Sequence, residues 1–323
     1  LKPNSLASIV SHSNVDSTLV DFGLIPFYSN LTYATVLPSN HIEFQFYRDT
    51  LAELKNYTIY RGEARDKLLP IDFMLKSEVE DVDRFQYPDL AADPDVRSYY
   101  YQVVTQNECD NVIDVSNLGR TIHLTVESDD EGLRNTLRWN RYVGWDSTTS
   151  HVNIYRGLEG VYSTEVHAVV TPDSRYDYSS FVDDISFDVT SAGKFCYRVE
   201  AVQGPFNDKV VNNYPNNLGS QTSNSNVVCV VQEPLMYVPN AFAPDGVNRR
   251  FGPKGQFFNY TQFEMSIYNR WGELVYITRD INKGWNGTID GDDAGNGSYV
   301  YIIRYVDGDG EEHRKKGTVT LIR

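Results

Sequence analysis

The chain has 323 residues and a formal net charge of −15, from 44 acidic and 29 basic residues. Residues 1–235 carry all of this surplus, with 33 acidic and 18 basic residues, whereas residues 236–323 hold 11 of each. Nucleic acids and anionic lipids attract clustered Lys and Arg, so this balance argues against both as partners. No stretch approaches the roughly 18 consecutive apolar residues of a spanning helix, and we expect no direct membrane insertion.

Two segments in the first part of the chain recur further on. Residues 56–62 and 151–157 both end in Ile-Tyr-Arg-Gly, and residues 99–104 match residues 195–200. Tyr60 and Tyr155 are 95 residues apart, the size of one β-sandwich module. The repeat predicts two tandem modules.

We place the two modules at residues 1–127 and 128–235. The boundary is set at residues 127–132, a charged stretch with a glycine that is typical of a linker.

The second repeat unit carries three strand patterns in order. They are Trp139 on an early strand, the Tyr-Arg strand at Tyr155, and a strand with alternating Tyr197, Val199 and Ala201. This succession resembles fibronectin type III domains, which implies an antiparallel sandwich with one buried face on each sheet. The first unit has no tryptophan at the equivalent place, so its start is not fixed by the sequence.

The chain has three cysteines and no Cys-x-x-Cys pair, too few for a metal cluster. Cys196 and Cys229 lie on the last two expected strands of the second module, and the alternation of Tyr197, Val199, Val228 and Val230 places both cysteines outward. Neighbouring antiparallel strands bring such residues within bridging distance. We expect a disulfide; two separate thiols are the alternative. Cys109 has no evident partner.

Sequence signatures of catalysis and cofactor binding do not occur. The chain has no Gly-x-Ser-x-Gly, no His-Glu-x-x-His and no phosphate loop, and its six histidines are scattered. Asp290, Asp292 and Asp293 lack the spacing and distal Glu of an EF-hand, so we expect a solvated turn there. We therefore expect no enzyme activity, no cofactor and no metal.

The last part of the chain, residues 236–323, alternates like a small antiparallel β domain. Phe263, Met265 and Ile267 alternate with polar residues, and the tyrosines of residues 299–305 do the same up to a hairpin turn at residues 307–310. A last strand follows at residues 317–322, where we expect Val319 and Leu321 to face the core. About seven short strands fit an immunoglobulin-like sandwich.

The same segment carries a series of short motifs with fixed order. Their residues are Pro239, Asn240, Phe242, Asn269, Arg270, Trp271, Gly272, Trp285, Gly287, Tyr299 and Leu321. The series resembles the gliding-motility-associated C-terminal domain of Bacteroidetes surface proteins, a type B signal of the type IX secretion system. The resemblance implies that residues 236–323 are an address read by an outer-membrane exporter.

Together these features predict an all-β chain of three tandem immunoglobulin-like or fibronectin type III-like sandwiches. The resemblance implies the C-terminal part of a larger precursor, a gliding adhesin exported across the outer membrane to the cell surface. Its implied partners are the type IX translocon and the shuttle proteins of the outer membrane; surface glycans are a further candidate. Strand addition through residues 317–323 is one plausible mode of recognition.

A secreted hydrolase is the alternative. Its catalytic domain would lie upstream and use the same modules and the same export signal. Nothing in these residues decides between the adhesin and the hydrolase.

Overall fold

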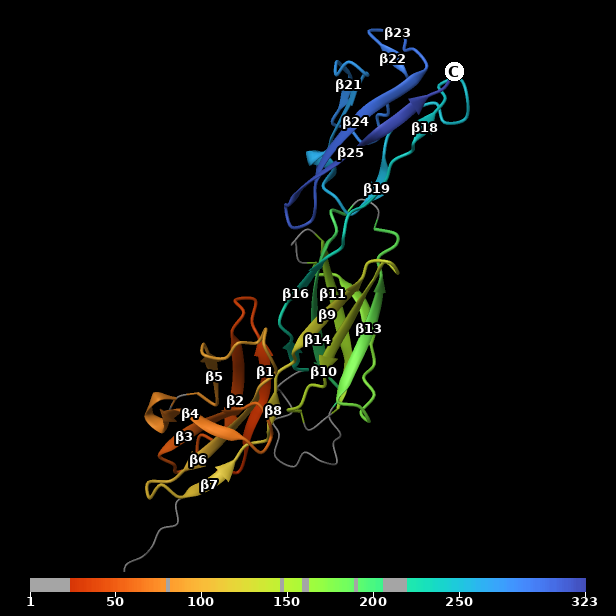
Figure 1. Ribbon diagram of the computed structural model, residues 1–323. Helices are drawn as coiled ribbons and strands as arrows, with labels where there is room; N and C mark the ends of the chain where they lie inside the picture. Colours follow the sequence, from red (N-terminus) through yellow and green to blue (C-terminus); the bar gives the residue numbers. More distant parts are fainter. Residues whose placement is uncertain (1–23, 80–81, 146–147, 159–162, 189–190, 206–219) are drawn as a thin grey trace, which may run out of the picture.

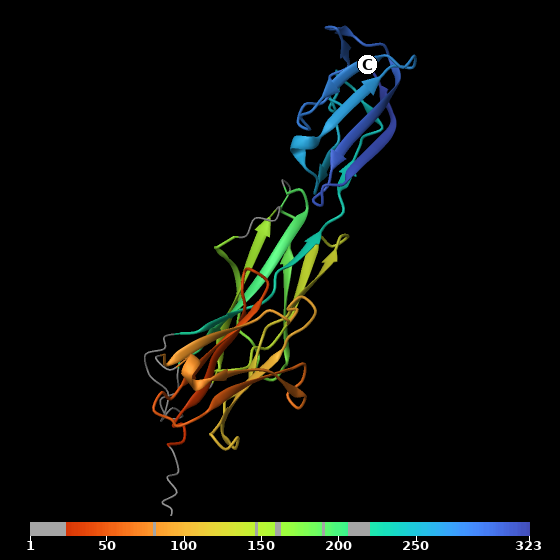
Figure 2. The same ribbon diagram turned by 90° about the vertical axis from the view of Figure 1, so that its left-hand side faces the viewer.

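The computed structural model describes residues 24–79, 82–145, 148–158, 163–188, 191–205 and 220–323. Within them the chain is all-β, as predicted, with two single-turn 3-10 helices, η1 (Lys76–Glu78) and η2 (Tyr260–Gln262). None of the helices in these ranges is long and apolar enough to cross a membrane. Three β sandwiches make an elongated molecule, with the second between the other two (Figure 1) and the last beyond its far end in both views (Figure 2).

The first sandwich packs a three-stranded sheet on a larger one. The first sheet is β1 (Ser29–Val36), β2 (Ile42–Arg48) and β5 (Arg84–Asp89); the second is β4 (Leu68–Leu75), β3 (Asn56–Gly62), β6 (Tyr100–Gln106), β7 (Val112–Val115) and β8 (Gly119–Arg120). Alternate residues of the strands fill the space between the sheets, among them Phe44, Phe46, Tyr57 and Ile59.

The second sandwich repeats this arrangement. One sheet is β9 (Leu124–Asp129), β10 (Arg134–Asn140) and β13 (Tyr178–Asp184); the other is β12 (Val166–Val170), β11 (Thr149–Leu158), β14 (Lys194–Gln203), β15 (Thr222–Asn224) and β16 (Val228–Val231). The repeated segments form β3 and β6 in the first sandwich and β11 and β14 in the second, and the two members of each pair are neighbours. Trp139 is 2% exposed, in the core.

The linker expected at residues 127–132 is instead a hairpin inside the second sandwich. Strand β9 runs through Glu127 to Asp129 and pairs with β10, and the Asp129 carboxylate accepts a hydrogen bond from the Gly132 N–H at 2.9 Å. Charged residues and glycine serve a tight turn as well as a linker, so composition did not distinguish the two. The core of this sandwich already includes Ile122.

The first two sandwiches are joined by direct hydrogen bonds near β1. The Tyr142 hydroxyl accepts from the Ala34 N–H at 3.1 Å, the Trp145 indole donates to the Thr32 carbonyl at 2.9 Å, and the Ser223 hydroxyl donates to the Ala34 carbonyl at 2.7 Å. Tyr142 and Trp145 lie in the segment that follows β10, and Ser223 lies on β15. The three bonds fix the angle between the two units.

The last sandwich is built on a five-stranded sheet. Its order is β18 (Ala241–Phe242), β25 (Glu312–Leu321), β24 (Gly297–Val306), β20 (Glu264–Tyr268) and β21 (Leu274–Thr278). The two-stranded pairs are β17 (Leu235–Tyr237) with β19 (Lys254–Gln256) and β22 (Thr288–Ile289) with β23 (Asp292–Asp293). Val319 and Leu321 are 0% and 1% exposed, so the expected inward set of the last strand is confirmed.

Phe257 connects this last sandwich to the second one. Its ring is fully buried in the hydrophobic core of the second sandwich, edge-on to Phe195 with the ring centres 6.0 Å apart. The next residue, Phe258, is buried in the core of the last sandwich. The backbones also approach closely here, since a Cβ at Gly193 would lie 2.9 Å from the Phe257 Cβ and one at Gly308 only 2.8 Å from the Lys194 nitrogen. The two sandwiches therefore share packed residues.

Candidate functional site

Several of the motif residues form the core of the last sandwich. Phe242, Trp285, Tyr299 and Leu321 are each at most 8% exposed. The Trp285 ring lies 5.3 Å from Phe242 and 4.8 Å from Tyr299, centre to centre, and its indole N–H donates to the Thr288 carbonyl at 2.8 Å. Buried aromatic pairs of this kind stabilise the fold by more than their buried area alone accounts for. These motif residues therefore shape the domain and are not presented to a partner.

Pro239 and Asn240 lead the chain into β18, which runs parallel to the end of β25. The Thr320 N–H donates to the Asn240 carbonyl at 2.9 Å, and the Ile322 N–H donates to the Phe242 carbonyl at 3.1 Å. The expectation of strand addition through residues 317–323 fails at Thr320 and Leu321, because β18 pairs with them on one side and β24 pairs on the other. The motif at Asn240 closes this edge.

Gly287 is required for close packing next to the last strand. It has φ +80°, and an added Cβ would lie 2.8 Å from Pro244 Cγ and 2.9 Å from Leu321 Cδ1.

The Arg323 side chain holds the same region together. Its guanidinium donates to the Gly287 carbonyl at 3.0 Å and pairs with the Asp293 carboxylate at 2.7 Å, so Asp293 is ion-paired and not only solvated. The Arg323 N–H also donates to the side-chain oxygen of Asn296 at 2.9 Å.

The turn between β20 and β21 carries the remaining motif residues. The side-chain oxygen of Asn269 accepts from the N–H groups of Trp271 and Glu273, each at 3.0 Å, and Gly272 has φ +85°. Arg270 lies over the Trp271 ring, 4.4 Å from its centre, and Trp271 is 77% exposed. Trp271 is therefore a motif residue displayed at the surface on a rigid turn.

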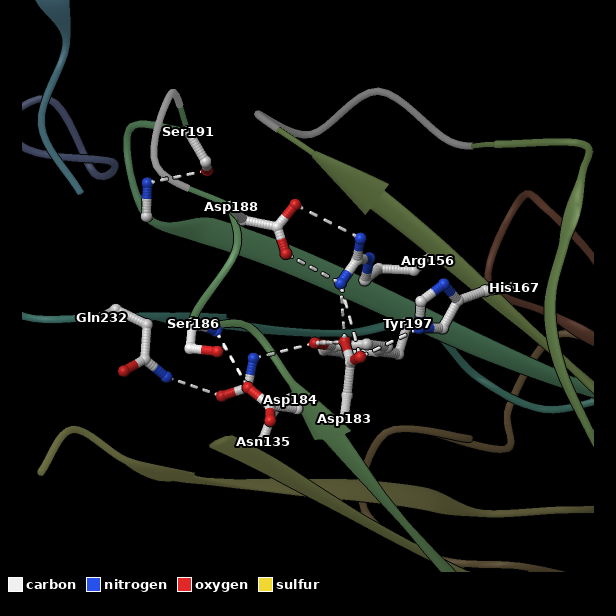
Figure 3. Close-up of polar contacts among 11 residues, drawn as sticks. Asn135, Arg156, His167, Asp183, Asp184, Ser186, Asp188, Ser191, Tyr197 and Gln232 are labelled. Atoms are coloured by element: carbon white, nitrogen blue, oxygen red, sulfur yellow. Dashed lines mark hydrogen bonds and ion pairs between the residues drawn. The ribbon is translucent and has the colours of Figure 1, made fainter. Parts of the chain in front are cut away.

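The most chemically distinctive cluster lies elsewhere, inside the second sandwich (Figure 3). Arg156 on β11 pairs with the carboxylates of Asp183 at 3.1 Å and Asp188 at 3.0 Å. Asp183 also contacts the His167 ring nitrogen at 2.9 Å and accepts from the Tyr197 hydroxyl at 2.7 Å. The first sandwich has the same arginine, aspartate and tyrosine arrangement: Asp89 pairs with Arg61 at 2.7 Å and accepts a hydrogen bond from the Tyr101 hydroxyl at 2.8 Å.

Ionisation in this cluster favours a structural role. Burial would raise the pKa of Asp183, but hydrogen bonds from His167 and Tyr197 and the charge of Arg156 hold it below its ordinary value. Burial first, and then the charge of Asp183, raises the pKa of Tyr197 well above its usual range. The tyrosine therefore stays protonated as a donor and the aspartate stays ionised, an arrangement that fixes the ion pair with Arg156. No group of three or more His, Cys, Asp or Glu that could hold a metal ion occurs within the described residues.

This cluster was not predicted from the sequence, although the alternation of the strands contained a signal for it. Arg61 and Arg156 have the same parity as the buried Ile59 and Ile154, so each arginine points inward and needs a buried counter-charge. Asp89 and Asp183 are buried near the ends of β5 and β13 and supply it.

Cys196 and Cys229 are opposite each other on β14 and β16 and form a disulfide, with Cα atoms 4.1 Å apart. Cys229 is exposed, but Cys196 is 2% exposed, whereas the alternation placed it outward with Arg198. The bonded Cys229 covers it. Cys109 is a free, exposed thiol.

The last sandwich is a compact β domain with a packed aromatic core and one exposed tryptophan, Trp271. Residues 236–321 match the family model of the CHU_C type IX secretion signal domain. The predicted resemblance is thereby confirmed. The chain carries a type IX secretion signal and is exported out of the cell.

No curated protein matches the chain. Among solved structures it is similar to a tetra-tandem repeat in the extending region of a large adhesion protein, with 14% identity and a TM-score of 0.34 over 91% of this chain and 73% of that one. It is also similar to a Ca²⁺-stabilized adhesin that helps an Antarctic bacterium reach out and bind ice, with 11% identity and a TM-score of 0.22 over 91% and 75%.

The disulfide gives a direct prediction. The bridge spans a sequence separation of 33 residues, and the loop-entropy estimate for a bridge of this size is about 3–4 kcal/mol. Replacing both cysteines by serine should lower the free energy of unfolding by that amount in urea titrations. Non-reducing peptide mapping should link the two peptides while Cys109 remains open to alkylation. Three free thiols in the exported protein would contradict the assignment.

The buried aspartate predicts an acid-sensitive second sandwich. Because the pKa of folded Asp183 is lowered from 3.8, its stabilisation is complete above that value and is lost as pH falls through the folded pKa. Asp183→Asn should lower the free energy of unfolding by about 3–5 kcal/mol at pH 7, because Arg156 keeps only one counter-charge. Between pH 5 and pH 2 the free energy of unfolding of the Asp183→Asn variant, measured in urea titrations, should fall by less than that of the native chain. The same pH dependence in both proteins would refute the assignment.

Proposed function

We propose that the chain is the stalk and export-signal region of a large cell-surface adhesin of the gliding-motility type found in Bacteroidetes. One observation carries the proposal: the export signal is packed directly onto a series of closed sandwiches. Phe257 joins the last two units, and hydrogen bonds near Ala34 join the first two. Such a series transmits force and sets distance, which is what a stalk requires.

The proposed mechanism is recognition of the folded signal domain by the type IX translocon and its outer-membrane shuttle proteins. Five of the eleven motif residues are buried, and their role is to produce one well-defined surface; they are Phe242, Trp285, Gly287, Tyr299 and Leu321. An exporter that binds the exposed side chains of this surface would therefore bind the signal domain only when it is folded.

Catalysis is not part of the proposed function. The Arg156 and Asp183 cluster is the strongest candidate for chemistry within the described residues, and the pKa shifts keep the Tyr197 hydroxyl protonated and the Asp183 carboxyl ionised, which favours a fixed ion pair.

The second candidate is a secreted hydrolase whose catalytic domain precedes these modules. It would use the same signal domain in the same way. The domain content of the full precursor separates the two candidates: a catalytic domain favours the hydrolase, and a long series of sandwich repeats favours the adhesin.

The export step is tested by a buried position of the last strand. Leu321→Asp places an unpaired charge in the core, which should cost about 4 kcal/mol or more of the 5–15 kcal/mol that a domain typically has. The full chain behind a signal peptide and a reporter should then stay in the periplasm, whereas the native chain reaches the surface. Cell fractionation and protease accessibility measure the distribution.

Thr318→Lys is the matched control, because Thr318 lies on the same strand and is exposed. It should be exported like the native chain. Export of the native chain in a strain without the translocon, or normal export of Leu321→Asp, would refute the proposed function.

A further inference from the structure

The outward face of the five-stranded sheet has an unusual distribution of charge. On β24 and β25 the residues that face away from the core include Arg304, Arg314 and Lys316, and Arg304 and Arg314 are direct cross-strand partners. Like charges placed opposite each other destabilise a sheet. Within the described residues neither Arg314 nor Lys316 forms an ion pair, whereas Glu264 is shared between Arg279 at 3.2 Å and Arg304 at 3.4 Å.

An exposed apolar strip lies on the same face of the sheet, two strands from Arg304 and three from Arg314 and Lys316. Ile277 is 50% exposed and Leu274 is 47% exposed, both on β21, and Trp271 precedes them in the turn at 77%. Apolar surface rimmed by charged residues is typical of an interaction site. We name the set Trp271, Leu274, Ile277, Arg304, Arg314 and Lys316 the outer basic face.

The edge of this face can pair with a polypeptide. Strand β21 is the last strand of its sheet, and no described segment pairs with its outer side. An unpaired strand edge presents N–H and C=O groups that a second strand can pair with, and a lipid headgroup cannot form that ladder.

We propose that the outer basic face docks an acidic protein of the export machinery, which adds one strand beside β21 and covers the face as far as β25. Carboxylates of that protein would neutralise Arg314 and Lys316, and its apolar side chains would cover Trp271, Leu274 and Ile277. This inference rests on the proposed function and specifies its recognition surface. Residues 1–235 carry 33 acidic against 18 basic residues, so an acidic partner is repelled by the stalk and directed to the signal domain.

The test reverses two charges on the full chain. In R314E/K316E the glutamate at position 314 faces Arg304, an opposite-charge pair, so the melting temperature should not fall. The amount of R314E/K316E on the cell surface should be about tenfold lower than that of the native chain, which corresponds to a loss of roughly 1.4 kcal/mol of binding free energy. The matched control is R250E/K254E, which changes the net charge equally at two exposed residues outside the five-stranded sheet and should be exported normally.

Normal export of R314E/K316E would overturn the inference, as would an equal loss of export in R250E/K254E, which would indicate net charge as the cause. Two further measurements exclude other occupants. Phosphatidylglycerol vesicles that bind the native chain and not R314E/K316E would assign the face to lipid, and a native dimer that R314E/K316E abolishes in sedimentation would assign it to a second copy. Either result overturns the inference. Translocon-independent export of the native chain would instead refute the proposed function.

Discussion

The burial of one phenylalanine ring across a domain boundary is the constraint on which the arrangement of the signal domain depends. Phe257 belongs by sequence to the last sandwich and by packing to the second, while its neighbour Phe258 fills the core of its own domain. The backbone bends at this dipeptide, with φ +64° at Phe257, so the two adjacent rings enter different cores. A left-handed φ at a residue other than glycine is strained, and the packing of the Phe257 ring in the second core offsets that strain.

The motif residues that the structure places in the core stabilise the fold of the signal domain, and one exposed turn presents Trp271 at the surface. Trp285, Tyr299 and Leu321 build the core, and Gly287 allows the last strand to pack closely. The ordered turn at Asn269 is different, because its hydrogen bonds hold Trp271 in a solvent-exposed position. The surface beside that turn is where charge and apolar area coincide, and the proposed partner surface follows from this coincidence.

Alternation was the reliable part of the sequence analysis. It predicted the all-β fold and the inward Val319 and Leu321, because one face of each strand must leave water. It also contained the inward Arg61 and Arg156, which were overlooked because a buried arginine is recognisable only together with its counter-charge on another strand. The edge of the last strand and the core that Phe257 enters depend on contacts between distant segments, and no local pattern encodes them. The hairpin at residues 127–132 is local, but charged residues and glycine suit a turn and a linker alike.

The central claim is that the signal domain and the second sandwich are one cooperative unit. Hydrogen exchange of the full chain with Phe257→Ala tests it most directly, with Phe187→Ala as the control because Phe187 is 86% exposed. A buried Phe→Ala change typically costs about 3–5 kcal/mol. The account predicts that Phe257→Ala lowers protection in both β14 and β24 while Phe187→Ala changes neither. Loss confined to the strands around residue 257, with β14 unaffected, would contradict the account.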